Sequence, residues 1–212
     1  MKALFVLAGS PPSEDLLRSA VADADHVIAV DGGANVFASY QMEPDILIGD
    51  LDSVKHLDWT HCQVIQDKDQ ETTDLQKALG YINDNLHIDE IKLLGALGGR
   101  TDHLIHNLKI CASINKTTAV QIVSDKPQGS PRQVERIYRL TASQDLRLKL
   151  EPGSIVSLFA LAPFSGLSTA GLKWDLHDLD GGDSPISQSN LTIKQNAHFK
   201  LHAGTIYIAV YQ

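Results

Sequence analysis

The most constraining feature of this sequence is a short apolar run, Ile46–Ile48, which leads into two carboxylates, Asp50 and Asp52. An uninterrupted apolar run of this kind is typical of a parallel strand that is buried on both faces of its sheet. In open α/β sheets, ligands bind just beyond the carboxyl ends of such strands. If the chain stays extended through Leu51, both carboxylates lie on one side, where a divalent cation could join them to a phosphate. An isolated Asp-x-Asp is also common in solvated turns, so this interpretation depends on the rest of the chain.

Strand-like and helix-like patterns alternate through the first half of the chain. Strands are expected at residues 1–8, 26–30, 46–48, 63–65, 91–94 and 119–123. Ser13 is placed as a helix N-cap, and Thr73 with Gln76 has the spacing of a capping box at the start of another helix. Further helices are expected at residues 34–40 and after Arg100. This alternation predicts an α/β domain with a mostly parallel sheet.

The second half of the chain has a different character. Residues 125–132 are rich in proline and glycine, which is typical of a linker, and no convincing helix pattern follows them. Strands are expected near residues 146–150 and 155–161, with two more between 199 and 210. We therefore predict two domains, 1–128 and 129–212, of which the second is an all-β, sandwich-like domain.

Three further blocks contain acidic residues or paired glycines near predicted strand ends. After the strand at 26–30, Asp31 is followed by two glycines that could let backbone N–H groups approach a phosphate. Asp74 lies at a predicted helix start, where it could bind a ligand or simply complement the helix dipole. The glycine-rich turn at 95–99 leads into a helix, and Arg100 could add a bidentate phosphate contact. Neither a Walker sequence nor the dinucleotide glycine fingerprint is present.

Taken in order, the blocks 31–35, 49–53, 70–74 and 95–103 resemble the motifs of the thiamine pyrophosphokinase family, also called thiamine diphosphokinase. The likeness continues through residues 171–174 and 189–190. That family has an N-terminal α/β catalytic domain, a C-terminal β domain that contributes to thiamine binding and dimerisation, and a homodimer with active sites between subunits. The resemblance implies that the chain uses ATP and magnesium. It also implies transfer of diphosphate from ATP to the hydroxyl of thiamine, which yields thiamine diphosphate and AMP.

The resemblance also implies a role for each matching residue. The catalytic acids are Asp50, Asp52, Asp74 and Asp102, of which Asp50, Asp52 and Asp74 are the magnesium-site carboxylates. ATP and its phosphates are contacted by Asp31, Gln70, Thr73 and Arg100, and the thiamine pocket contains Trp174, Ser189 and Asn190. Asp102 could orient or deprotonate the thiamine hydroxyl, although a position at a helix N-terminus makes a carboxylate a weak base.

The composition limits which classes of molecule the chain is expected to bind and in which cellular compartment we expect it. The formal net charge of −8 argues against nonspecific nucleic-acid binding, which needs a basic surface. The two cysteines lie far apart, so neither a disulfide framework nor a zinc knuckle is expected, and a reducing cytoplasm is the simplest location. The apolar start at residues 1–8 is short for a signal peptide, and no run approaches the roughly 18 apolar residues of a membrane span.

Two other functions fit parts of the sequence. A haloacid-dehalogenase-type phosphatase carries an Asp-x-Asp-x-Thr/Val signature that residues 50–54 resemble, with Asp50 as the nucleophile. That signature usually opens its fold, whereas two predicted strands precede it in this chain. A noncatalytic nucleotide-binding protein is the third alternative, and it would bind ATP without releasing AMP when thiamine is added.

Overall fold

The computed structural model describes residues 1–55, 58–125, 134–142, 144–182 and 186–212. These residues form two compact units, one containing Met1–Ile110 with Ile122–Gln128 and the other containing Cys111–Gln121 with Gly129–Gln212. Most of the predicted linker at 125–132, and with it the predicted boundary near Gly129, lies outside the described residues.

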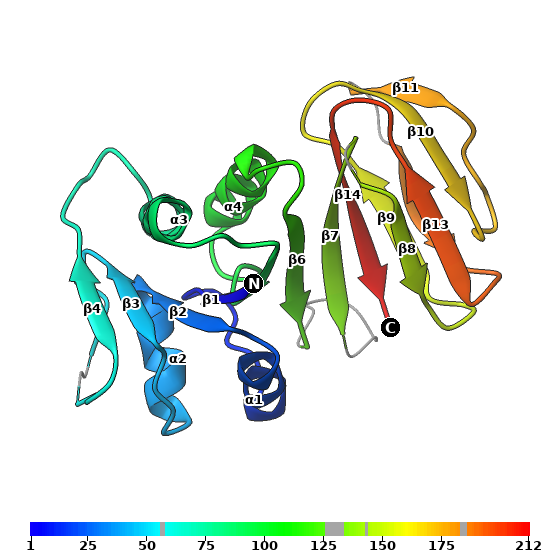
Figure 1. Cartoon of the computed structure of the whole chain (residues 1–212). Coiled ribbons are helices and arrows are strands. Elements are labelled where there is room, and N and C mark those ends of the chain that lie inside the picture. Colours follow the sequence, from blue (N-terminus) through cyan, green and yellow to red (C-terminus); the bar gives the residue numbers. More distant parts are fainter. Residues whose placement is uncertain (56–57, 126–133, 143, 183–185) are drawn as a thin grey trace. The chain divides into compact units, whose positions relative to one another are not determined.

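The first unit alternates strands and helices (Figure 1). In chain order the elements up to residue 124 are β1 (Lys2–Val6), α1 (Glu14–Ala22), β2 (His26–Val30), the 3-10 turn η1 (Asp31–Gly33), α2 (Ala34–Ser39), β3 (Ile46–Gly49), β4 (Gln63–Gln66), α3 (Asp74–Asn85), β5 (Glu90–Leu94), α4 (Thr101–Ser113) and β6 (Ala119–Ser124). The end of α4 and the start of β6, within Cys111–Gln121, belong to the second unit. The strand order is β6-β5-β1-β2-β3-β4. The pairs β1–β5, β1–β2, β2–β3 and β3–β4 are all parallel, as the alternation predicts.

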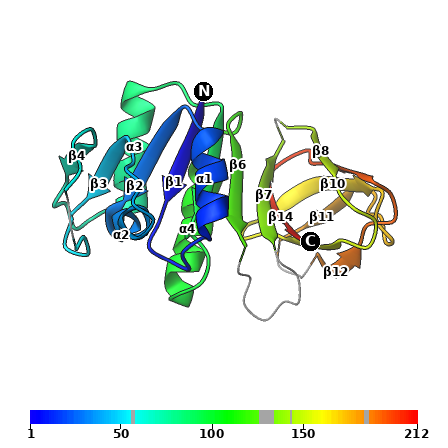
Figure 2. The ribbon, with the colours of Figure 1, turned by 90° about the horizontal axis from the view of Figure 1, so that it is seen from below.

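Helices cover both faces of this parallel sheet, with α1 and α2 on one face and α3 and α4 on the other (Figures 1 and 2). Phe5, Ile28 and Leu47, from three neighbouring strands, are fully buried, which explains why their strands are apolar without alternation. Two predicted helix starts are confirmed. Ser13 accepts a hydrogen bond from the Leu16 N–H, and Thr73 forms the capping box that begins α3.

The second unit is built from two antiparallel sheets. Its strands are β7 (Glu135–Thr141), β8 (Leu146–Lys149), β9 (Ile155–Phe159), β10 (Phe164–Ala170), β11 (Leu179–Gly181), β12 (Ser187–Leu191), β13 (Asn196–Lys200) and β14 (Thr205–Tyr211). They are ordered β12-β9-β14-β7 in one sheet and β11-β10-β13-β8 in the other. Buried side chains from both sheets, among them Val156, Phe199 and Ile208, share one apolar core. As predicted, no helix occurs in the described residues from 134 onward.

Four strands of this unit were not predicted from the sequence. They are β7, β10, β11 and β12. In β7 the charged Arg139 interrupts the apolar pattern, but its side chain is buried and donates hydrogen bonds to four backbone carbonyls. These carbonyls belong to Cys111, Ile114, Asn115 and Thr118, at the end of α4 and in the loop that follows. Carbonyls at a helix C-terminus lack intrahelical donors, so Arg139 satisfies them, and its hydrogen bonds explain why Cys111–Gln121 belongs to the second unit.

None of the helices within the described ranges combines the length and the apolar character needed to span a membrane.

Candidate active site

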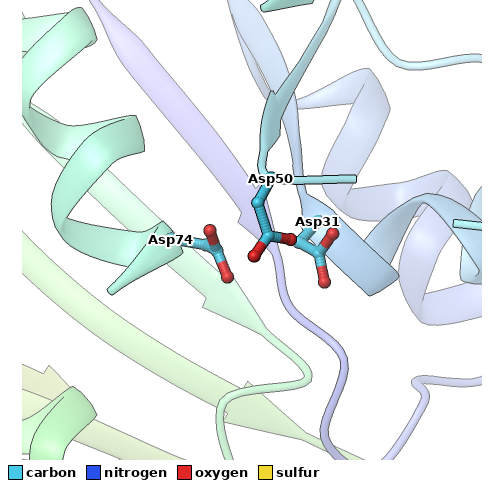
Figure 3. Close-up of side chains that lie close together, drawn as sticks. All are labelled: Asp31, Asp50 and Asp74. Atoms are coloured by element: carbon cyan, nitrogen blue, oxygen red, sulfur yellow. The ribbon is translucent and has the colours of Figure 1, made fainter. Parts of the chain in front are cut away.

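Three carboxylates converge at the edge of the parallel sheet. One oxygen from each of Asp31, Asp50 and Asp74 lies within 4.8 Å of the others (Figure 3). Asp31 directly follows β2, Asp50 directly follows β3, and Asp74 is the first residue of α3. We call these three residues the acidic trio. They meet because the carboxyl ends of neighbouring parallel strands lie at one edge of the sheet, where ligands bind in such folds.

Glycines permit the close backbone approach that assembles the acidic trio. A Cβ atom on Gly49 would lie 2.7 Å from the Cβ of Asp31, so a side chain there would push the end of β3 away. Gly33 serves a different contact, since its Cβ would lie 1.9 Å from the carbonyl oxygen of Val6. Close packing against β1 explains Gly33, and the approach of backbone N–H groups to a phosphate at these glycines stays a prediction.

The chain does not stay extended through Leu51, which was the condition for placing Asp50 and Asp52 on one side. Leu51 adopts the left-handed region with φ 69°, and the Asp52 N–H donates back to Asp50 Oδ1 at 3.2 Å. This turn ends the two-residue period that would have put Asp50 and Asp52 on one side. Asp52 is exposed and accepts a hydrogen bond from the Ser53 hydroxyl at 2.9 Å. The structure therefore groups Asp31 with Asp50 and Asp74 and leaves Asp52 beside the trio, so a metal-binding role for Asp52 stays a prediction.

Asp31 carries an electrostatic cost that a cation would relieve. It is only 9% exposed, and its Oδ1 has no hydrogen-bond partner among the described residues. Burial, followed by the charges of Asp74 and Asp50, raises the pKa of Asp31, although hydrogen bonds from Gly32 and Ser53 oppose the shift. A buried carboxylate oxygen that no described residue bonds, beside two other carboxylates, matches the oxygen ligands that Mg²⁺ and Ca²⁺ prefer. The acidic trio therefore fits a hard divalent cation.

Lys77 is a site residue that sequence reasoning missed. Its side chain is 3% exposed, and its Nζ lies 3.1 Å from Asp74 Oδ1 and 3.1 Å from the carbonyl oxygen of Asp67. Burial opposes the charged form, but Asp74, Asp67 and Asp50 outweigh it and raise the pKa of Lys77. Lys77 is thus a fixed positive charge that holds Asp74 in place. The available signal was its spacing, because a lysine three residues after Asp74 lies one helical turn away.

Gln70 and Thr73, both predicted to contact phosphates, lie next to the acidic trio. The Asp52 N–H lowers the pKa of Asp50 most, and the side chains of Gln70 and Lys77 add to the effect. The Thr73 hydroxyl accepts from the Gln76 N–H at 3.4 Å and donates to the Gln76 side chain at 3.1 Å. Thr73 therefore fixes the first turn of α3, and with it the position of Asp74.

Arg100 and Asp102 form an ion pair at the start of α4. Two hydrogen bonds join them, Nε to Oδ1 at 3.1 Å and Nη2 to Oδ2 at 2.6 Å, and both side chains are more than half exposed. The hydrogen bond from Arg100 lowers the pKa of Asp102 to about 2. Asp102 is not one of the three grouped carboxylates, and at neutral pH it is ionised and a poor proton acceptor.

A surface hollow adjoins the acidic trio at Lys77. Ile48 and Ile65 form its apolar part, and the other lining residues are Asp67, Thr72, Gln76, Lys77, Gly80, Tyr81 and Asp84. Most of these lining residues offer hydrogen-bonding groups, which suits a small polar molecule.

In the second unit, the structure brings Trp174 and Asn190 together. Trp174 lies in the loop after β10 and is 56% exposed. Asn190 is fully buried on β12, and its side-chain amide hydrogen-bonds both the N–H and the carbonyl of Trp174. Ser189 is exposed, with a left-handed backbone at φ 55°. Of these three predicted pocket residues, only Trp174 and Ser189 present side chains at the surface.

Comparison with known proteins gives two family matches. The model described as "Thiamin pyrophosphokinase, catalytic domain" matches residues 17–123. The model described as "Thiamin pyrophosphokinase, vitamin B1 binding domain" matches residues 143–206. Between them, the two matches cover all the residues in which the sequence predicted a site.

Individual relatives agree with these matches. "Thiamine pyrophosphokinase 2" of Arabidopsis thaliana is 31% identical over 70% of this chain, which spans 58% of that relative's length. "Thiamine pyrophosphokinase 2" of Oryza sativa subsp. japonica is also 31% identical, over 77% of this chain and 70% of the relative.

Solved structures share the fold. Thiamin pyrophosphokinase from Candida albicans aligns with a TM-score of 0.78 at 17% identity, over 99% of this chain and 88% of that one. The thiamine pyrophosphokinase from Bacillus subtilis aligns with a TM-score of 0.77 at 20% identity, over 100% and 99% of the two chains.

We predict that Asp31→Asn and Asp50→Asn each weaken binding of Mg²⁺ by roughly tenfold or more, because each removes a charged oxygen from the trio. Asp52→Asn should have a smaller effect, since Asp52 lies outside it. Titration calorimetry, together with the rise in melting temperature on adding Mg²⁺, measures both effects. Asp15→Asn removes an exposed charge from α1 and is the matched control. Unchanged affinity in both trio variants would contradict the assignment, and an equal loss in Asp52→Asn would include Asp52 among the ligands.

The same variants test how much the ionised carboxylate of Asp31 lowers the stability of the folded chain. Because its pKa is raised on folding, the stabilisation from its protonated form is complete below the unfolded pKa and is lost as pH rises through the folded pKa. At neutral pH in a chelator, Asp31→Asn should therefore melt at a higher temperature than the wild type.

Proposed function

The chain belongs to the thiamin pyrophosphokinase family, and we propose that it is an ATP-dependent thiamine diphosphokinase. It would transfer diphosphate from ATP to the hydroxyl of thiamine, yielding thiamine diphosphate and AMP. The observation that carries this proposal is the acidic trio with Lys77, placed at the carboxyl edge of the parallel sheet within the matched catalytic region. The family assignment argues against a haloacid-dehalogenase-type phosphatase.

We assign the catalytic and ATP-binding role to residues 1–128, with Mg²⁺ as the metal. Asp50 and Asp74 would hold the ion with Asp31, and Asp52 remains a proposed ligand at the border of the trio. When bound, Mg²⁺ supplies charge neutralisation and alignment for polyphosphate oxygens. Lys77 keeps Asp74 in place, and Gln70, Thr73 and Arg100 are the proposed phosphate contacts.

The transfer forms a bond between the thiamine hydroxyl oxygen and the β-phosphorus of ATP. It breaks the bond between that phosphorus and the oxygen that leaves with AMP, and the hydroxyl proton must also be removed. Phosphoryl chemistry of this type depends on alignment and charge neutralisation more than on a strong base. Asp102, with a pKa of about 2, is suited to orienting the hydroxyl rather than to holding its proton.

We assign thiamine binding to residues 129–212, the part of the chain with the second family match. Trp174 would offer an aromatic face to the thiazolium cation or the aminopyrimidine ring, a contact worth about 0.5–2 kcal/mol. Ser189 would offer a hydroxyl, which can both donate to and accept from the pyrimidine edge. Asn190 belongs to the same pocket.

The reaction is tested by incubating the protein with ATP, Mg²⁺ and thiamine and identifying the products. We expect thiamine diphosphate and AMP, with no turnover in a chelator. Formation of ADP with thiamine monophosphate would contradict the proposal. ATP binding without AMP release would indicate a noncatalytic nucleotide-binding protein, and a trapped phosphoryl group on Asp50 would indicate the phosphatase.

Trp174→Ala should raise the Michaelis constant for thiamine severalfold and leave that for ATP nearly unchanged, because the two substrates are assigned to different domains. The melting temperature should fall little, since the side chain is 56% exposed. Trp59→Ala changes the chain's other tryptophan and is the control. Equal effects on both substrates with a large loss of stability would make Trp174 a packing residue instead.

We also propose a cytoplasmic homodimer with active sites between subunits. The family resemblance supports it, and a second copy would cover the exposed edges of a small β domain. Sedimentation velocity at micromolar concentration should give twice the mass of one chain. A monomer at that concentration would refute the proposal.

A further inference from the structure

The loop that carries Trp174 is fixed although the indole is exposed. Trp174 lies in its first part, residues 171–175, and the whole connection between β10 and β11 spans residues 171–178. The carboxylate of Asp175 accepts from the N–H groups of Gly171 at 3.2 Å and Leu172 at 3.0 Å. The N–H of Lys173 donates to the carbonyl of Leu191 at 2.8 Å. A bulky aromatic is thus displayed on a backbone that is held on both sides of it.

Asn190 completes this arrangement by holding the backbone of Trp174 itself. Its Nδ2 donates to the Trp174 carbonyl at 2.8 Å, and its Oδ1 accepts from the Trp174 N–H at 3.2 Å. The same amide also contacts Ser187 Oγ at 3.4 Å and the Leu191 N–H at 2.9 Å. A side-chain amide offers two donor hydrogens and two acceptor lone pairs, so these contacts saturate it. With Asn190 fully buried, no part of the amide faces a ligand.

A local irregularity in β12 aims Asn190 inward. The pairing of β12 with β9 changes register between Ser187 and Asn190, and Ser189 between them has φ 55°. Irregularities of this kind redirect side chains, and they are common next to functional sites. Ser189 stays exposed as a result, while the following residue points into the protein.

We infer that Asn190 is a positioning residue, which fixes the orientation of Trp174 and thereby sets the affinity for thiamine without touching it. This inference rests on the proposed function of Trp174. The side chain of Lys173 also limits how the ligand can stack on Trp174. Lys173 Nζ lies 4.6 Å from the centre of the Trp174 ring and covers one face, so thiamine uses the opposite face.

The test uses the full chain with Trp59→Phe, which leaves Trp174 as the sole tryptophan. In this background, Asn190→Ala should lower the fluorescence anisotropy of Trp174 and increase its quenching by acrylamide. The Michaelis constant for thiamine should rise roughly tenfold, the size expected when a buried hydrogen-bonded group is lost, while that for ATP stays within about twofold. Asn190→Asp keeps an acceptor for the Trp174 N–H but loses the donor to its carbonyl. It should give intermediate values, and it serves as the readout if the alanine variant does not fold.

Thr141→Val is the matched control for stability. Thr141 is fully buried in the same unit, and its hydroxyl donates to the Lys116 carbonyl at 2.8 Å. This variant should lower the melting temperature without changing Trp174 anisotropy or the Michaelis constant for thiamine.

Two results would overturn the inference. A raised Michaelis constant for thiamine with unchanged Trp174 anisotropy would mean that Asn190 contacts thiamine directly, and lowered anisotropy with an unchanged constant would separate Trp174 orientation from affinity. Failure of the proposed function is distinguishable, because the chain would then not turn over thiamine at all, and failure of the role proposed for Trp174 would show as an unchanged constant for thiamine in Trp174→Ala. In that case the anisotropy alone decides whether Asn190 holds Trp174.

Discussion

The repulsion among three carboxylates is the constraint on which this site depends. Asp31, Asp50 and Asp74 bring one oxygen each within 4.8 Å of the others. Three negative charges at this separation repel one another, and a cation between them replaces the repulsion with attraction. The protein holds them together by elements whose positions are fixed for other reasons: two strands buried in a parallel sheet and a helix begun by a capping box. Lys77 offsets part of the repulsion through Asp74, while one oxygen of Asp31 has no hydrogen-bond partner in the part of the chain that the structure describes. The fold therefore favours binding of a divalent cation at the carboxyl ends of these strands.

Much of the first unit could be predicted because its determinants are local. Apolar runs gave the parallel strands, and the Thr73–Gln76 spacing gave the start of α3. The convergence of strand-end carboxylates follows from topology, because parallel neighbours end at the same edge. The turn at Leu51 could not be predicted, since leucine has no preference for the left-handed region and only the surrounding contacts place it there. Lys77 was missed because a lysine on a helix normally belongs to its solvated face.

The second unit was less predictable because its strands depend on distant contacts. Arg139 breaks the apolar alternation of β7, yet it is buried there because the carbonyls at the end of α4 accept its hydrogen bonds. The polar strand β12 has a register shift and so lacks a regular alternation. In both strands the partner that explains a polar residue lies far away along the chain, so the sequence does not show that the two residues meet. Strand propensity is context-dependent for this reason.

Contact and positioning are different roles that a sequence motif does not separate. The resemblance placed Thr73 among the phosphate contacts and Asn190 among the thiamine contacts, and in the structure each bonds neighbouring groups of its own chain. For Thr73 the consequence is specific, because a hydroxyl has one donor hydrogen and Thr73 already directs it to Gln76. Binding a phosphate oxygen through that hydroxyl would require Thr73 to give up its bond to the Gln76 side chain, although it could still accept from the Gln76 N–H and cap α3. For Asn190 all four hydrogen-bonding positions are occupied by groups of its own chain and the side chain is fully buried, so a direct contact would have to break one of these bonds and also uncover the amide. Thr73 can thus combine both roles at the cost of one hydrogen bond, whereas Asn190 can serve the pocket only through the residue it holds.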